Sequence, residues 1–238
     1  QIRVDWQNQV TERNENDNIY TKTIVVTSAS APTADDSVTV GTGKDGTTYA
    51  EAPGAVAVDA DGDYVVVWTA PDVAGIDRLY FRLFNADGSV AGGVTAVAPG
   101  GSAASIPNDE QRNGSVACDD AGDFVVTWTS YAGDEQDVYA RRYSAAGEAL
   151  EDAPFRVNTY LTNNQKWSNV AMDADGDFVI TWSSLGQEDN NQLGNGYGVY
   201  ARRYDSFGQP QSPEFQVNLT TGGDQRFSKE LNARMREA

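Results

Sequence analysis

The chain has 238 residues, 39% of them apolar, which is enough for one large or two small domains with a sizeable core. Its 17 basic and 35 acidic residues give a net charge of −18, which argues against nucleic acid as a partner because phosphate binding needs clustered lysine and arginine. The absence of histidine excludes Ser-His and Cys-His catalysis and the usual zinc sites.

The predicted elements begin with three β segments, IRVDW at 2–6, IYTKTIVV at 19–26 and SVTV at 37–40. Segments of the same kind recur along the chain, and none has the 3.6-residue period of a helix. Two aromatic anchors mark the recurrence: tryptophans at Trp6, Trp68, Trp128 and Trp182, and tyrosines at Tyr20, Tyr80, Tyr139 and Tyr200. The tyrosines stand 60, 59 and 61 residues apart, which predicts a repeat of about 60 residues.

Each full copy of the repeat predicts four short strands joined by hairpins. A first strand of the VAxD type is followed by an acidic turn with glycine, which supplies the backbone conformations that a hairpin needs. The second strand runs through the tryptophan, the third through the tyrosine, and a fourth ends the copy. In the three full copies the first strands are 56–59, 116–119 and 170–173, and the fourth strands are 94–98, 155–158 and 215–218.

This pattern predicts an all-β fold that is β-propeller-like, with about four four-stranded blades. The four copies are approximately 1–49, 50–108, 109–162 and 163–224, within a single repeat domain of residues 1–238. We expect the tryptophans to fill the gaps between neighbouring blades. The segment 225–238 begins with QRFS, which matches QKWS at 165–168, so it is a candidate to complete the first blade and close a four-bladed ring. The alternative is part of a larger propeller or array.

The repeat DxDGDFVVTWSS…VYARRYDxxG…FQVN resembles tandem repeats of very large secreted and surface proteins of bacteria, which often also carry RTX-type or cadherin-like modules. The resemblance covers residues 109–228 well and 50–108 fairly. It implies an extracellular or cell-surface module with a role in adhesion, matrix or envelope assembly. It implies no defined catalytic residues.

The acidic turns are candidate calcium ligands, because calcium takes six to eight oxygens and a carboxylate-rich turn supplies several. Their residues are Asp59, Asp61, Asp63, Asp119, Asp120, Asp123, Asp173, Asp175 and Asp177. The EF-hand pattern fails, since the twelfth position counted from Asp59 is Ala70 rather than glutamate. An Asp-Gly hairpin accounts for the same residues without metal. The sequence indicates no other cofactor.

A basic residue follows each anchor tyrosine by two positions, at Lys22, Arg82, Arg141 and Arg202. Strand alternation places it between aromatic neighbours, so it needs a carboxylate or a ring as partner. We expect an ion pair with an acidic turn. The alternative is a set of cations that converges on a channel and binds an anion. Cys118 aligns with apolar residues and is predicted to pack in the core.

Two features that do not repeat are candidate ligand sites. Trp167 is a candidate platform for stacking on a sugar, with packing at a blade edge as the alternative. The loop after the last tryptophan is long and polar, and such insertions commonly bind ligands, although a tolerated surface insertion is the other interpretation. Its candidate residues are Gln187, Glu188, Asp189, Asn190, Asn191, Gln192 and Asn195.

Three functions follow from these observations. The first is a surface repeat module for adhesion, matrix or envelope assembly, which binds other surface or matrix subunits or glycans through its loops and is not an enzyme. The second is a carbohydrate-binding module or lectin. The third is a carboxylate-based glycoside hydrolase or lyase, for which Glu188 and Asp189 are the clearest acidic pair outside the repeat pattern. No apolar run approaches the roughly 18 residues of a membrane-spanning helix, so we expect no membrane insertion.

Overall fold

The structure is a computed structural model, and the part it describes is all β. The described residues are 55–72, 74–103, 109–132, 135–188, 196–219 and 225, and all belong to one compact unit, Thr39–Ala238. Within them twelve strands form three four-stranded antiparallel sheets. The first predicted repeat, with Trp6 and Lys22, lies outside the described residues, as does the segment 226–238. No helix in the described part is long and apolar enough to cross a membrane.

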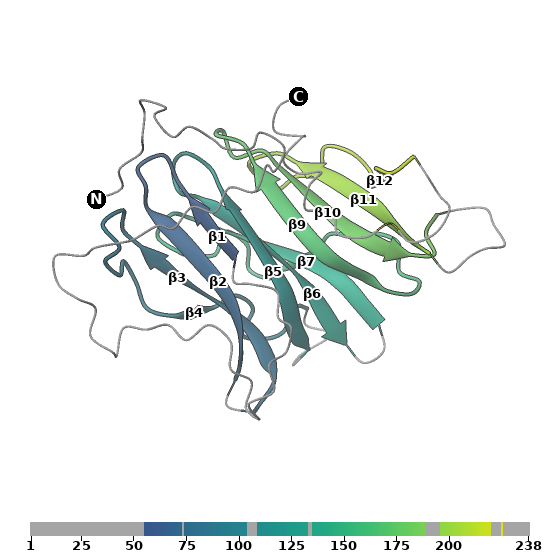
Figure 1. The fold of residues 1–238 in the computed structure, drawn as a ribbon, viewed down its shortest axis with the longest axis horizontal. Coiled ribbons are helices and arrows are strands. Elements are labelled where there is room, and N and C mark those ends of the chain that lie inside the picture. Colours follow the sequence, from purple (N-terminus) through teal and green to yellow (C-terminus); the bar gives the residue numbers. More distant parts are fainter. Residues whose placement is uncertain are drawn as a thin grey trace, which may run out of the picture. The chain divides into compact units, whose positions relative to one another are not determined.

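The three sheets follow the chain and lie side by side (Figure 1). Sheet A contains β1 (Ala55–Val58), β2 (Tyr64–Pro71), β3 (Asp77–Phe84) and β4 (Thr95–Ala96). Sheet B contains β5 (Glu110–Cys118), β6 (Phe124–Ala132), β7 (Glu135–Tyr143) and β8 (Phe155–Arg156). Sheet C contains β9 (Gln165–Met172), β10 (Phe178–Leu185), β11 (Tyr197–Tyr204) and β12 (Phe215–Gln216). Every sheet has the order first, second, third, fourth, as the hairpin pattern predicts.

The first strands of sheets B and C are longer than predicted. They begin at Glu110 and Gln165, several residues before the VAxD motif, and each contains a register shift against its neighbour. At these bulges Asn113 has φ 58° and Trp167 has φ 57°, in the left-handed region. The inserted residue breaks the period-two alternation, so the sequence pattern gave no sign of a strand there. Gly114 completes the first bulge, since a Cβ there would lie 2.6 Å from Leu79 Cδ2.

Aromatic and β-branched side chains fill the space between sheets. Trp128 and Trp182 are fully buried, and each pairs across its hairpin with the anchor tyrosine of its sheet. Trp68 occupies the equivalent position opposite Tyr80, which confirms that the tryptophans are equivalent. The prediction that Trp68 is also buried is wrong, because it is only partly covered. Its face of sheet A is not packed against another described sheet.

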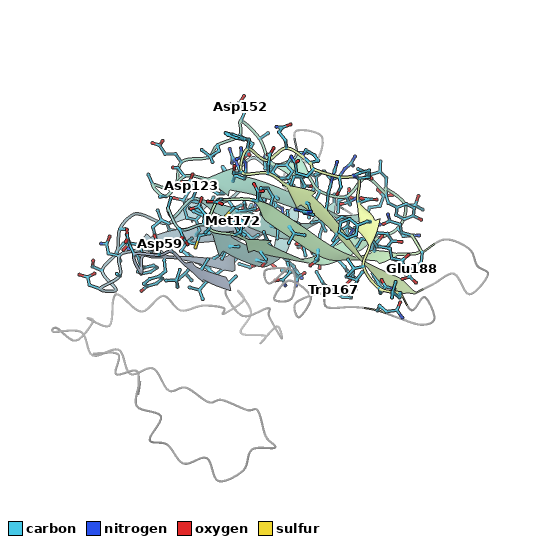
Figure 2. The ribbon with its side chains drawn as sticks, turned by 90° about the horizontal axis from the view of Figure 1, so that it is seen from above. Asp59, Asp123, Asp152, Trp167, Met172 and Glu188 are labelled. Carbon is cyan, nitrogen blue, oxygen red and sulfur yellow. The ribbon has the colours of Figure 1, made fainter. Side chains whose placement is uncertain are left out.

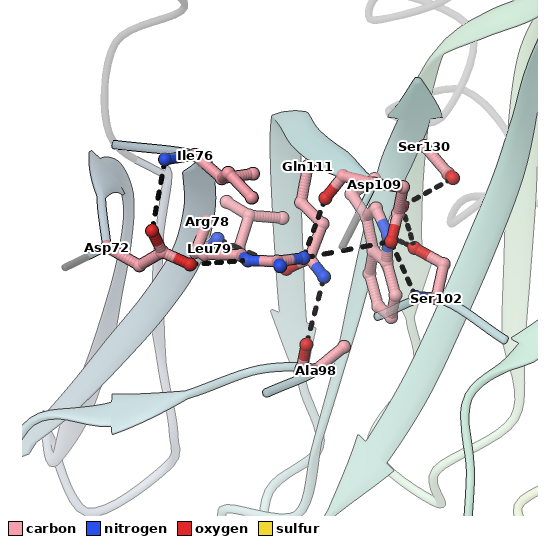
Figure 3. Close-up of polar contacts among 10 residues, drawn as sticks. Asp72, Ile76, Arg78, Leu79, Ala98, Ser102, Asp109, Gln111 and Ser130 are labelled. Carbon is pink, nitrogen blue, oxygen red and sulfur yellow. Dashed lines mark hydrogen bonds and ion pairs between the residues drawn. The ribbon is translucent and has the colours of Figure 1, made fainter. Parts of the chain in front are cut away.

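A buried polar network joins sheet A to sheet B (Figure 3). The carboxylate of Asp109, with its side chain 1% exposed, accepts hydrogen bonds from the hydroxyls of Ser102 and Ser130 and lies 3.8 Å from Arg78 Nη1. Ser102 in turn accepts the indole N–H of Trp128. These bonds satisfy polar atoms that would otherwise be costly to bury, and so they fix how the two sheets meet.

Candidate functional site

The two bulges lie at the ends of the sheets where the first strands begin. A bulky residue in the left-handed region is an outlier, with a cost of roughly 1–2 kcal/mol, and such outliers gather at functional sites. Trp167 is the clearest case, because asparagine tolerates this conformation and tryptophan does not. The candidate site therefore centres on Trp167 and Asn113, and Figure 2 labels Trp167 among the side chains.

In sheet C, Trp167 belongs to a small aromatic and cationic cluster. Its ring centroid lies 5.2 Å from that of Tyr197, which begins β11. The Lys166 ammonium stands 4.2 Å from the Trp167 ring centroid and 5.0 Å from that of Tyr197. Trp167 and Lys166 are partly buried, so part of each remains accessible to solvent.

In sheet B, Arg112 occupies the position equivalent to Lys166 and holds two carboxylates. Its Nη2 lies 2.8 Å from Asp77 Oδ2 and 3.0 Å from Glu110 Oε2. Its guanidinium also stands 5.6 Å from the ring centroid of Tyr131. The hydroxyl of Tyr131 donates a hydrogen bond to Asn113 Oδ1, at 3.2 Å, so the left-handed residue of this bulge is tied to the same group.

The two clusters are neighbours. Thr129 pairs with Arg112 across the hairpin, and its hydroxyl accepts the backbone N–H of Trp167 at 3.1 Å. Burial raises the pKa of Tyr131 above its ordinary value, Arg112 opposes that rise, and the charges of Glu110 and Tyr197 add to it. The site is thus a continuous group of aromatic rings, two cations and two carboxylates around the starts of β5 and β9, with Asp77 contributed by β3 of sheet A.

The described residues of the long loop are hydrogen-bonded to sheet C. Gln187 donates to Glu214 Oε1 at 2.6 Å, and Glu188 accepts from the side-chain amides of Gln216 and Asn218. These contacts tie the start of the loop to the β12 side of the sheet. The other predicted loop residues, Asp189, Asn190, Asn191, Gln192 and Asn195, lie outside the described residues, so the predicted role of the loop stays a prediction.

The acidic turns lie at the other ends of the first strands and close the hairpins. In each turn the first aspartate accepts two backbone N–H groups: Asp59 from residues 61 and 63, Asp119 from 121 and 123, and Asp173 from 175 and 177. The last aspartate of each turn accepts one more N–H from the turn between the third and fourth strands. Among the described residues no group of three or more acidic, cysteine or histidine side chains could hold a metal. Calcium binding stays a prediction.

The expected ion pairs of Arg82, Arg141 and Arg202 are not formed within the described residues. Arg141 donates to the backbone carbonyls of Val97 and Glu151, and Arg202 to those of Val157 and Ser212. Each guanidinium also stands 5.7–5.9 Å from the centroid of a ring on its own strand. The expectation was wrong because backbone carbonyls take the place of carboxylates: Gly92, Glu151 and Ser212 in the arginine's own copy, and Val97 and Val157 after the fourth strand of the preceding sheet.

The sequence indicates Trp167 as a candidate, but it does not indicate the residues that the structure places around it. Glu110 and Arg112 lie before the VAxD motif, where no strand is predicted, and Asp77 and Tyr131 lie next to loops between second and third strands to which no role is assigned. One signal was available: the tripeptides QRN at 111–113 and QKW at 165–167 align, and they put a cation and an unusual residue at the same place in two copies.

No family model and no curated protein matches this chain. Solved structures do. The Hadza microbial sialidase Hz136 matches 69% of this chain with a TM-score of 0.50 and 8% identity. The GH93 α-L-arabinofuranosidase of Fusarium graminearum matches 70% with a TM-score of 0.46 and 9% identity, and the polysaccharide lyase Uly1 matches 69% with 0.43 and 10%. The likeness is one of fold. The chain spans 36–48% of the length of these three proteins.

These matches correct two expectations drawn from the sequence. An adhesion, matrix or envelope module was expected, and an enzyme was not. The finding against both is the match to a sialidase, which is a carbohydrate-processing enzyme. The adhesion role came from a resemblance to bacterial surface repeats, and residues that pack a repeated sheet carry no information about chemistry.

Proposed function

We propose that the three sheets are consecutive blades of a β-propeller and that the protein is a carbohydrate-processing enzyme. Its glycan binds where β5 and β9 begin, over the rings of Trp167, Tyr197 and Tyr131. The parallel succession of three equivalent sheets in Figure 1 and the fold likeness to a sialidase support the propeller. Closure of the ring by residues outside the described part belongs to the same proposal.

The observation that carries the proposal is the conformation of Trp167. A tryptophan at φ 57° is strained, and it is not needed for the bulge, since Asn113 makes the equivalent bulge in sheet B. A large, partly exposed ring beside a tyrosine is a surface on which the apolar face of a sugar can stack. A role in sugar binding therefore explains why a strained tryptophan stands at this bulge, whereas the packing of the sheet does not require one.

Two carboxylates beside the aromatic rings supply the chemistry. Asp77 and Glu110 contact the same nitrogen of Arg112, which places their contacting oxygens within about 6 Å of each other. Retaining glycosidases use two carboxyl groups about 5 Å apart, which lies within that limit. This pair takes the place of Glu188 and Asp189, because Glu188 is hydrogen-bonded to Gln216 and Asn218 on the β12 side of sheet C and Asp189 lies outside the described residues.

Binding is tested with the Trp167→Asn variant. Calorimetric titration with a panel of oligosaccharides is expected to detect binding by the parent protein. The variant should lose affinity by about 5- to 150-fold, since ring stacking is worth about 1–3 kcal/mol. Phe207→Ala is the matched control, because Phe207 is an aromatic side chain that is 78% exposed in the turn between β11 and β12. Equal losses in both variants would contradict a specific site.

Turnover is tested with Asp77→Asn and Glu110→Gln. We expect release of new reducing ends or unsaturated products by the parent protein and a fall of at least a hundredfold in either variant. Glu151→Gln is the control, since Glu151 also pairs with an arginine, Arg142, but at a distance from the bulges. Glycan binding by a parent protein that turns over none of the panel would contradict the enzymatic part of the proposal.

A further inference from the structure

We infer that this site takes anionic sugars, whose carboxylate or sulfate group pairs with Lys166. The inference rests on the proposed function, because it names the class of glycan that binds at Trp167. It arises from a comparison of two equivalent positions on the first strands of sheets B and C, which differ in how the charge of the basic residue is balanced.

In sheet B the charge of Arg112 is balanced by protein. Asp77, from the third strand of the preceding sheet, and Glu110, two residues earlier on its own strand, both contact its guanidinium. This arrangement shows how the fold neutralises a cation at the bulge. It also shows that the cation there is built to meet carboxylate oxygens.

At the equivalent site around Lys166 both balancing carboxylates are replaced by amides. The position of Asp77, on the third strand of the preceding sheet, is taken by Gln136 on β7 of sheet B, which likewise stands three residues before the tyrosine that pairs with its sheet's tryptophan. The position of Glu110 is taken by Asn164, directly before the aligned glutamine Gln165. Neither replacement can neutralise a cation.

Lys166 is consequently a cation without a carboxylate partner in the described part of the chain, where six ion pairs are formed and none includes it. Its ammonium is held instead over the rings of Trp167 and Tyr197. Cation–π contacts orient the group but leave its N–H donors for an oxygen ligand. A cation with no described carboxylate partner beside a sugar-stacking ring favours a ligand that carries its own carboxylate or sulfate.

The test compares three oligosaccharides of equal length: neutral, carboxylated and sulfated. For the parent protein, calorimetry is expected to show about tenfold tighter binding of the anionic ligands than of the neutral one. Lys166→Gln should remove that difference, so that the three ligands bind the variant with equal affinity. Arg203→Gln is the control of equal charge change, since Arg203 is an exposed cation on β11. The carboxylated and sulfated ligands separate the two sources of negative charge.

A second variant adds what sheet C lacks. Gln136→Asp restores the carboxylate that sheet B has, and it should abolish the preference for anionic ligands while Trp167 still binds the neutral one. Indole N–H signals of Trp167 in heteronuclear spectra report whether any glycan reaches the site. Movement of that signal with equal affinity for all three ligands would overturn the anion preference alone. No movement with any ligand would overturn the proposed function as well.

Discussion

Replacing Trp167 by asparagine separates a functional residue from a packing residue. The substitution puts into sheet C the residue that sheet B has at the same place, with nearly the same φ. It removes the ring pair with Tyr197, worth about 0.5–1.5 kcal/mol, and the cation–π contact with Lys166, worth about 0.5–1 kcal/mol. It also relieves about 1–2 kcal/mol of left-handed strain. The free energy of unfolding should therefore change by no more than about 1.5 kcal/mol.

Urea unfolding followed by circular dichroism measures this change. Trp128→Ala is the contrasting variant, since Trp128 is fully buried and its loss should cost about 3–5 kcal/mol. A loss of 3 kcal/mol or more for Trp167→Asn would refute the reasoning, because it would show that Trp167 is held in its strained conformation by packing. A small change in stability together with lost glycan binding would support a site at the bulge.

Three further predictions concern the frame around the site. Arg141→Met removes two hydrogen bonds to carbonyls and should lower the free energy of unfolding by about 1–3 kcal/mol. The loss should be equal at pH 4 and pH 7, because no carboxylate is involved. A loss confined to pH 7 would support the ion-pair hypothesis instead. Asp123→Ala removes the acceptor for the Ala145 N–H and should lower the free energy of unfolding by about 1 kcal/mol in the absence of calcium. If calcium raised the melting temperature of the parent protein but not of the variant, the turns would bind the metal. Burial raises the pKa of Tyr204 from 10.0 to about 12. Between pH 10 and pH 12 the folded state therefore keeps the phenol proton that the unfolded state loses, and the free energy of unfolding should fall as the pH rises. Tyr204→Phe should make that fall smaller.

The strands of the three sheets were predictable because their causes are local. β-Branched and aromatic residues, an acidic turn with glycine and an anchor tyrosine every 59 to 61 residues recur along the chain. Because the same strand and turn pattern recurs along the chain, it predicts the strands more firmly than one copy would. The bulges were not predictable in this way, since a left-handed residue such as Trp167 or Asn113 leaves no periodic mark in the sequence.

The partners of the arginines and the residues of the candidate site could not be predicted from the sequence, for a different reason. Arg141 binds backbone carbonyls, which every residue has and which the sequence therefore does not distinguish. The aspartates of the acidic turns were the only acceptors that the sequence pattern indicated. Asp77 and Arg112 meet only because consecutive sheets pack against each other. Trp167 is a candidate from the sequence because the preceding copy has Asn113 at the same place, and departures from a repeat indicate function more readily than the repeat itself.

A crystal structure of the protein soaked with an anionic oligosaccharide tests the glycan site most directly. We expect density for a sugar ring in contact with Trp167 or Tyr197 and a carboxylate or sulfate oxygen within hydrogen-bond distance of Lys166 Nζ. Density for the ligand at the acidic turns around Asp59 or Asp119, with none over Trp167, would contradict the proposed site.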